Sequence, residues 1–404
     1  MNRCIFCGRD LTENKKPEHV LATAFGGRKS TTAVVCGECN QRFGGTIDKE
    51  FAEQLKVLRN QLQFPSGSGK RPPQIPNVRS GTDRLNIRND GTPELVIKPF
   101  HTLSHDDGTR QIEIVINETE DLREKLARIV SSLAAKFRLP EDDIKRKLAD
   151  GVAKTVRKRP KPFSLSFSFG CINSLRSITK SALVLWALLV GNEEVRSNAY
   201  KDARAFVTEG GEAFNRTKVL GDSRHTPSTA ELCHRFSKFF TLVYVTSDAD
   251  GRVVAHFTLY NFIAWRIVLA EQGGTPNIKT ALVSNPINLE WSDTIAEEID
   301  IPVDWMDKAV CAEGDVINRL ATAAEYVAEV SLIREIEKLV EEVSRTHDVR
   351  NDNDTIPSSI VYDMITEISE KLALYTLRVP YEQRLTPDDL EILLGLKKLG
   401  GDTG

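Results

Sequence analysis

Two closely spaced pairs of cysteines lie near the start of the chain and constrain its fold more than any other feature. Cys4 and Cys7 form one C-x2-C pair, and Cys36 and Cys39 form the second. This spacing allows both thiolates of a tight turn to bind one tetrahedral Zn²⁺ ion, and four thiolates leave no open position for water. The sequence therefore predicts a structural zinc site in a segment too short to bury a core of its own. Four unrelated buried cysteines or a redox pair are the alternatives, but a redox C-x2-C does not need a second pair.

The residues between and after the cysteine pairs form a pattern of their own. An acidic residue precedes a histidine, a Gly-Gly turn follows, an apolar run leads into the second pair, and an asparagine comes directly after it: Glu18-His19, Gly26-Gly27, Ala33-Val34-Val35 and Asn40. This pattern resembles the HNH endonucleases, in the branch that carries two C-x2-C pairs, over the segment from Cys4 to Ile47. The resemblance implies a ββα-metal fold, in which a β-hairpin and a helix surround one divalent metal ion, and it implies a nucleic-acid substrate.

The resemblance also implies a role for each of three residues. His19 is expected to be the general base, and Glu18 and Asn40 are expected to hold a catalytic Mg²⁺ or Mn²⁺ ion. An imidazole with a pKa of about 6.5 can take a proton from water near neutral pH. Carboxylate and amide oxygens are hard ligands that leave positions for water and a substrate phosphate. The middle asparagine of the family pattern has no counterpart here, because its place falls near Thr31 or Thr32.

Glu18 and His19 are neighbours on an expected strand, so their side chains should point to opposite faces unless the strand is bent. Arg28, Lys29 and Arg42 are the candidate contacts to nucleic acid, and the expected partner is double-stranded DNA. Charge is uneven along the chain: residues 1–80 contain 13 Lys and Arg against 7 Asp and Glu, and residues 291–404 contain 11 against 25. A positive surface attracts a polyanion, which an acidic tail repels.

The chain as a whole predicts an α+β protein with four regions. The N-terminal HNH-like unit is expected over residues 1–63 and a linker rich in Pro, Gly and Ser over 64–83. A mixed α/β region with antiparallel hairpins is expected over 84–303, and an acidic helical region over 304–404. The role of the mixed region is expected to be target recognition or regulation.

Several local elements are expected within these regions. Asp90-Gly91 and Asp250-Gly251 lie between alternating runs and predict hairpins, with a third strand over 109–117 beside the first. Strict alternation predicts a strand over 163–170, and apolar composition predicts a buried helix over 178–190. Helices are expected over 122–137 and 141–155, and the four tryptophans are expected in the core.

The remaining expectations concern location and rival functions. The apolar run over 178–190 is shorter than the roughly 20 residues of a membrane span, and no secretion signal opens the chain. The 7 cysteines do not suggest a disulfide framework, so we expect a cytoplasmic protein without a membrane partner. Two rivals to the nuclease remain: a zinc ribbon that binds nucleic acid without cutting it, and a protein that docks partners through its acidic helices. The sequence predicts no oligomeric state.

Overall fold

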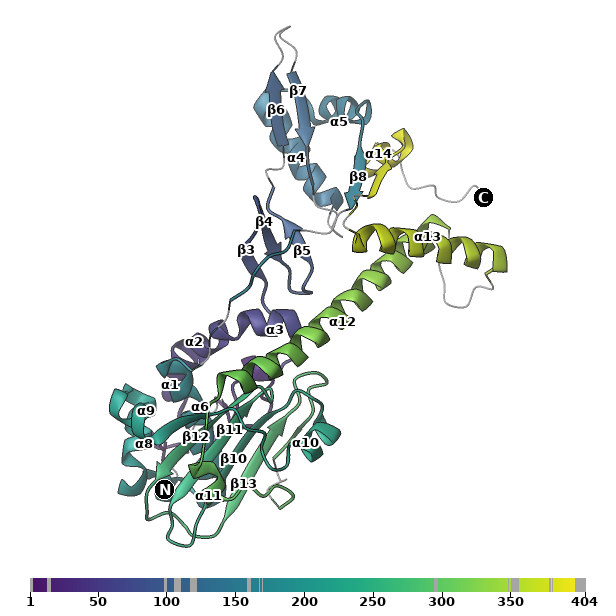
Figure 1. Cartoon of the computed structure of the whole chain (residues 1–404). Helices are drawn as coiled ribbons and strands as arrows, with labels where there is room; N and C mark the ends of the chain where they lie inside the picture. The colour runs from purple at the N-terminus through teal and green to yellow at the C-terminus, as the bar shows by residue number, and fades with distance from the viewer. Residues whose placement is uncertain are drawn as a thin grey trace. The chain divides into compact units, whose positions relative to one another are not determined.

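The computed structural model contains two compact units, which are described separately (Figure 1). The first comprises Met1–Ile75, Arg88–Gly91 and Leu165–Glu329, and the second comprises Pro76–Ile87, Thr92–Ser164 and Val330–Gly404. The structure describes residues 3–12, 16–97, 100–104, 110–116, 122–157, 161–166, 168, 170–293, 297–347, 349, 356–377, 379 and 381–396. The boundaries expected from composition remain predictions, and the segment expected as a linker contains strand β3 (Ile75–Ser80).

A six-stranded antiparallel sheet lies at the centre of the first unit, with strand order β14-β13-β10-β11-β12-β9. The hairpin expected at Asp250-Gly251 is confirmed, since it joins β10 to β11. Gly251 has a φ of 74°, in the left-handed region that glycine adopts without strain. The strands and the helices beside them are β9 (Val219–Asp222), β10 (Thr241–Ser247), β11 (Val253–Leu259), β12 (Ile263–Ala270), β13 (Lys279–Ser284), β14 (Trp291–Ser292), α10 (Thr229–Phe236) and α11 (Val303–Asp307).

Both faces of this sheet are covered, so alternate residues of one strand enter different cores. Val243 and Val245 of β10 belong to the core that contains helix α6 (Ile172–Val190). Leu242 and Tyr244 of the same strand pack on the other face, in a core with residues of α10 and α11. Every residue of β10, β11 and β12 is buried, which explains why these strands do not alternate strictly between polar and apolar residues.

Helix α6 confirms the expected buried helix and begins six residues before the apolar run. It ends at Gly191, whose φ of 89° a residue with a side chain rarely adopts. Trp186 on this helix is fully buried, and its indole Nε1 donates a hydrogen bond to the Tyr200 hydroxyl at 2.8 Å. Within the described ranges, no helix combines the length and apolar character needed to cross a membrane. Four short helices follow α6: α7 (Asn192–Arg196), η2 (Asn198–Tyr200), α8 (Lys201–Glu209) and α9 (Glu212–Lys218).

The N-terminal part of the first unit is a β-hairpin followed by a helix, as the resemblance implied. Strand β1 (Glu18–His19) pairs antiparallel with β2 (Ser30–Thr31), and α1 (Gly37–Gly45) follows. The rings of Phe25 and Phe51 lie 4.3 Å apart, in the same core as α6 and one face of the sheet. The hairpin and its helix are therefore built into the first unit rather than attached to it. The other elements of this part are η1 (Thr23–Phe25), α2 (Ile47–Gln54) and α3 (Lys56–Leu62).

The second unit contains small antiparallel sheets and helices. The hairpin expected at Asp90-Gly91 is confirmed as the connection between β4 and β5, but the expected third strand pairs with β6 in a separate sheet. Val130, Leu133 and Ile144 form part of a small core. Helix α12 begins among residues of the first unit and ends among those of the second. The elements are β4 (Asp83–Ile87), β5 (Pro93–Leu95), β6 (Phe100–Ser104), β7 (Arg110–Ile114), α4 (Leu122–Phe137), α5 (Glu141–Ala149), β8 (Lys154–Arg157), α12 (Glu313–Thr346), α13 (Ser358–Thr376), β15 (Tyr381–Arg384) and α14 (Pro387–Leu393).

Two expected elements are wrong in this region. The helix expected over 141–155 ends at Ala149, because Asp150-Gly151 interrupts it and the chain continues into β8. The strand expected over 163–170 is not formed by the described residues of that segment, which excludes Phe167 and Phe169. Alternation alone does not make a strand when no neighbouring strand offers hydrogen bonds.

Candidate active site and metal centre

The four cysteines of the two pairs converge, as expected. Their Sγ atoms all lie within 4.8 Å of one another, and the Sγ atoms of Cys7 and Cys36 are 3.5 Å apart. A disulfide has an S–S distance of about 2.05 Å, so these are separate thiols. Four sulfurs at about 2.3 Å from one tetrahedral zinc ion would lie about 3.8 Å from each other. The donor set and its spacing therefore fit one structural Zn²⁺.

The backbone around the cysteines favours thiolates. Gly8 has a φ of 77°, and its N–H donates to the Cys4 carbonyl at 3.0 Å to close the first turn. Cys36 is the N-cap of α1 and Cys39 lies in its first turn, where N–H groups favour negative charge. A hydrogen bond from the Cys39 thiol, helped by backbone N–H groups, lowers the pKa of Cys4 to about 4. The same bond raises the pKa of Cys39, and burial raises the pKa of Cys7. Thiolates are the form that binds zinc.

The Gly-Gly turn of the sequence pattern is required by close backbone packing. A Cβ atom on Gly27 would lie 1.7 Å from the carbonyl oxygen of Leu21. Gly26 has a φ of 90° and its N–H donates to the Thr23 carbonyl at 3.2 Å. The turn brings the chain back so that β2 pairs with β1, which is how the hairpin presents Glu18 and His19.

Glu18 and His19 point to different environments, as neighbours on a strand should. The Glu18 residue is 2% exposed, whereas His19 is half-buried. In the hairpin register, Glu18 is opposite Thr31 and His19 is opposite Ser30. The Thr31 hydroxyl accepts a hydrogen bond from the Ala33 N–H at 3.0 Å. Thr31 thus lies on β2 at the expected place of the middle motif residue, but its cross-strand neighbour is Glu18 rather than the histidine.

Asn40 reaches the start of the hairpin from α1. Its Nδ2 donates to the carbonyl oxygen of Pro17 at 2.7 Å. Pro17 immediately precedes Glu18, so this bond ties the helix to the strand that carries the acidic residue and the histidine. Because the amide nitrogen is engaged in this way, the amide oxygen of Asn40 is the atom left to act as a ligand.

A lysine far along the chain completes the surroundings of Glu18. Lys180 of α6 is fully buried, and its Nζ lies 2.5 Å from Glu18 Oε1 and 2.6 Å from Asp48 Oδ2. The Ser177 hydroxyl donates to the other oxygen of Asp48 at 2.5 Å. Burial lowers the pKa of Lys180, but the Asp48 and Glu18 carboxylates outweigh it and leave this pKa above its usual value. Lys180 is therefore a buried cation between two carboxylates.

Sequence reasoning missed Lys180 and gave Asp48 no role, although a signal for the lysine existed. Lys180 is the one charged residue in the apolar run over 178–190. A lysine is almost never fully buried without a partner, so its position predicted a buried carboxylate nearby. The sequence could not say which carboxylate, because Glu18 lies 162 positions earlier.

One oxygen of Glu18 remains without a partner. Glu18 Oε2 is buried, and no described residue donates a hydrogen bond to it. A buried carboxylate oxygen without a donor is costly unless something absent from the protein chain satisfies it. A divalent cation would satisfy it, and the carboxylate oxygen of Glu18 and the amide oxygen of Asn40 are donor types that Mg²⁺ or Mn²⁺ accepts. The chemistry of these two oxygens therefore suits such an ion.

The environment of His19 keeps its imidazole neutral. Burial and the nearby Lys180 ammonium both lower the pKa of His19 below its usual value of 6.5. A neutral imidazole at neutral pH is the form that accepts a proton. The geometry thus provides a proton acceptor next to the carboxylate on the same strand.

The candidate nucleic-acid contacts lie close to the histidine along the hairpin. Lys29 is next to Ser30, the cross-strand neighbour of His19, and its carbonyl accepts from the Val20 N–H at 3.0 Å. Lys29 forms an ion pair with Asp293, and its Nζ lies 5.7 Å from the centroid of the Trp291 ring. The third candidate, Arg42, is exposed on α1.

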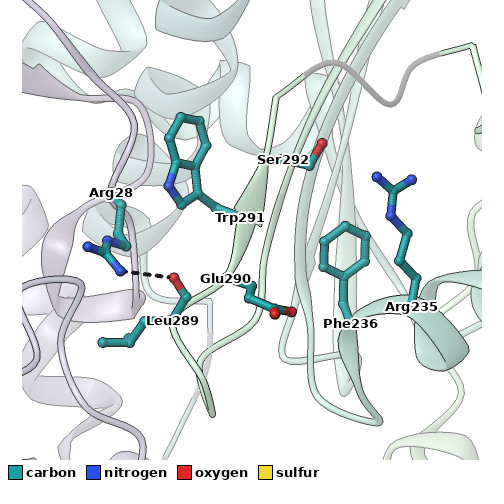
Figure 2. Close-up of a pocket in the computed structure, with 7 residues that line it drawn as sticks. All are labelled: Arg28, Arg235, Phe236, Leu289, Glu290, Trp291 and Ser292. Carbon is teal, nitrogen blue, oxygen red and sulfur yellow. Dashed lines mark hydrogen bonds between the residues drawn. The ribbon is translucent and has the colours of Figure 1, made fainter.

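Arg28 lines an open cavity of about 550 Å³ beside β14. Figure 2 shows Arg28 and Trp291 on one side of this cavity and Arg235 with Phe236 on the other. The Arg28 guanidinium donates to the Leu289 carbonyl at 3.2 Å. Trp291 is 40% exposed, so the expectation that it belongs to the core is wrong. An exposed indole in a cavity that two arginines also line is a surface on which a base can stack.

Comparison with known proteins agrees with the geometry of the N-terminal segment. The HNH endonuclease family model matches residues 4–56. No curated protein and no solved structure gives a significant match to the chain. The matched residues contain the cysteine cluster, the β1–β2 hairpin and α1. Residues 4–56 therefore form a domain of the HNH endonuclease family, with a cysteine cluster that fits structural zinc.

Proposed function

We propose that this domain hydrolyses phosphodiester bonds of double-stranded DNA, with His19 as the general base and with Glu18 and Asn40 as the ligands of Mg²⁺ or Mn²⁺. The observation that carries the proposal is the bond from Asn40 to the Pro17 carbonyl, which brings the helix residue to the strand that holds Glu18 and His19. This bond supports the assignment because it ties Asn40 to the strand that carries the other two residues of the family pattern. The zinc cluster, with two of its cysteines on α1, supports their positions.

Each residue contributes a separate part of the chemistry. His19 accepts the proton of the attacking water, since its lowered pKa keeps the imidazole neutral. Glu18 Oε2 and the amide oxygen of Asn40 would hold the divalent cation, which when bound neutralises charge on the phosphate oxygens and the leaving oxygen. The products are expected to carry a 5′ phosphate and a 3′ hydroxyl, as the family resemblance implies.

The cations next to the hairpin support a nucleic-acid substrate. Arg28 and Lys29 directly precede β2 and lie within two positions of the cross-strand neighbour of His19. Arg28 and Arg42 are both exposed, so each side chain is accessible to a phosphate of a bound nucleic acid. Trp291 beside Arg28 offers a stacking surface for a base close to the cut.

A plasmid assay tests the proposal. Zinc-loaded protein with Mg²⁺ or Mn²⁺ is expected to nick or linearise supercoiled plasmid, and labelling of the ends should reveal 5′ phosphates. His19→Ala should abolish cleavage with unchanged zinc content and unchanged DNA binding. His234→Ala is the matched control, because His234 is exposed on α10 and lies outside residues 4–56; it should cleave like the wild type.

One observation favours a second candidate function. Lys180 already engages Oε1 of Glu18, which leaves a single oxygen of that carboxylate for a cation. A domain that binds nucleic acid without cutting it is compatible with this arrangement. If wild type and His19→Ala bind DNA equally and neither cuts it with any divalent ion, the non-cleaving binding module is the correct reading.

A further inference from the structure

The two carboxylates that contact Lys180 are satisfied to different extents. Both oxygens of Asp48 are engaged, one by the Ser177 hydroxyl and the other by Lys180. Only one oxygen of Glu18 is engaged, and its Oε2 is buried with no described donor. Both oxygens of Asp48 therefore have a hydrogen-bond donor, whereas one oxygen of Glu18 has none among the described residues. In an ion-pair cluster that only stabilises the fold, a buried oxygen without a donor would cost free energy and give nothing in return.

The net charge of this cluster is too small to neutralise a divalent cation. Glu18 and Asp48 contribute two negative charges and Lys180 contributes one positive charge, so the cluster carries one net negative charge. Resting on the proposed function, we propose that Lys180 is a resident counter-charge that holds down the affinity of Glu18 for a divalent cation. The negative charge still needed for tight binding is then supplied by a phosphate of the bound nucleic acid.

Lys180 comes from outside the matched HNH segment, on helix α6. Polar contacts line the interface of α6 with α2: Asn173 Nδ2 donates to Glu50 at 2.6 Å, and the Ser174 hydroxyl donates to Gln54 at 2.6 Å. These contacts fix the helix and its lysine relative to Asp48. The part of the chain that follows the nuclease segment in sequence thus sets the charge at its site.

Direct measurement of Mn²⁺ binding tests this inference without relying on cleavage. Free Mn²⁺ is followed by electron paramagnetic resonance during titration of the zinc-loaded full-length protein. Lys180→Met should tighten Mn²⁺ binding at least tenfold, because the buried ammonium that repels the cation is removed. Asp48→Asn should weaken it at least tenfold, because the cluster becomes neutral. If both variants weaken binding, Lys180 acts only as a support for Glu18 and the inference is wrong.

A second buried lysine provides the matched control. Lys371 lies 2.8 Å from Glu342 and 2.7 Å from Glu367 in the second unit, so Lys371→Met also removes a buried cation from between two carboxylates. It should leave Mn²⁺ affinity unchanged. If Lys180→Met does not fold, Asp48→Asn decides alone, and unchanged or tighter Mn²⁺ binding by that variant overturns the inference.

The same titration separates this inference from the proposed function. Glu18→Gln should abolish Mn²⁺ binding at this site if Glu18 is a ligand. If Glu18→Gln has no effect, the assigned cation site is wrong, and the role given to Lys180 is wrong with it. If Glu18→Gln abolishes binding while Lys180→Met and the wild type bind alike, the cation site stands and only the counter-charge is refuted.

Coupling to the substrate is tested through DNA affinity, because linkage is reciprocal. In the His19→Ala protein, saturating Mn²⁺ at constant ionic strength should tighten binding of a DNA duplex at least tenfold. The double variant His19→Ala with Glu18→Gln should show no such gain. An equal effect of Mn²⁺ on both proteins would contradict the coupling.

Discussion

Replacement of Lys180 by methionine should destabilise the first unit through the carboxylates it leaves behind. The lysine side chain is 0% exposed, and those of its partners Glu18 and Asp48 are 3% and 14% exposed. Removal of one member of a buried ion pair typically costs about 3–5 kcal/mol, because the remaining charge is neither solvated nor paired. Because all three side chains are largely buried, we expect Lys180→Met to cost a free energy of unfolding in that range.

Tryptophan fluorescence during urea unfolding measures this cost in the right part of the molecule. All four tryptophans, at positions 186, 265, 291 and 305, belong to the first unit. With a denaturant slope of about 2 kcal/mol per molar urea, a loss of about 4 kcal/mol lowers the midpoint by about 2 M. An exposed ion pair provides the comparison: the Arg9 and Glu38 side chains are 59% and 67% exposed, so Arg9→Met should leave the urea midpoint nearly unchanged.

The same substitution in a protein without the two carboxylates tests whether charge is the cause of the destabilisation. In a Glu18→Gln, Asp48→Asn protein, no buried carboxylate loses its partner when Lys180 becomes methionine. The same substitution should then cost no more than about 1 kcal/mol or should stabilise the unit. An equal loss in both backgrounds would mean that methionine fails for reasons of packing, and the charge argument would be refuted.

Four other outcomes follow from the site. Cys36→Ser should remove the zinc ion and open residues 4–56 to limited proteolysis, as checked by metal analysis and mass spectrometry. Cleavage should decline only as the pH falls below 6.5, because burial and the Lys180 ammonium lower the pKa of His19. A decline that begins above pH 6.5 would contradict this. Arg28→Ala should weaken DNA binding and reduce the slope of log affinity against log salt by about 1. Trp291→Ala should cost about 1–3 kcal/mol of DNA binding and leave that slope unchanged, as fluorescence anisotropy can measure.

The features that sequence predicted correctly depend on local signals. The spacing within each cysteine pair limits where both thiolates can go, and the four sulfurs do meet. Asp250-Gly251 needs only the two runs beside it to specify a turn. The apolar run over 178–190 is long enough to form a helix, and it lacks the polar face of a surface helix. In each case the signal itself is contained in a short stretch of sequence.

The features that sequence missed depend on distant partners. Lys180 meets Glu18 from 162 positions away, and nothing near either residue encodes the pairing. The segment over 163–170 alternates as strands do, yet strand formation also needs a neighbouring edge. Trp291 was expected in the core because of its apolar surroundings in the sequence, but β14 is a two-residue strand at the edge of the sheet, where its side chain stays exposed.

The central claim is tested most directly by the single-turnover rate at which one labelled DNA duplex is cleaved. This rate is compared between wild type and His19→Ala at equal zinc content and equal bound DNA. General-base catalysis predicts that the wild type is faster by about 10²–10⁴-fold. Rates that agree within about threefold lie far below that range and would show that the imidazole on the hairpin does not activate the attacking water.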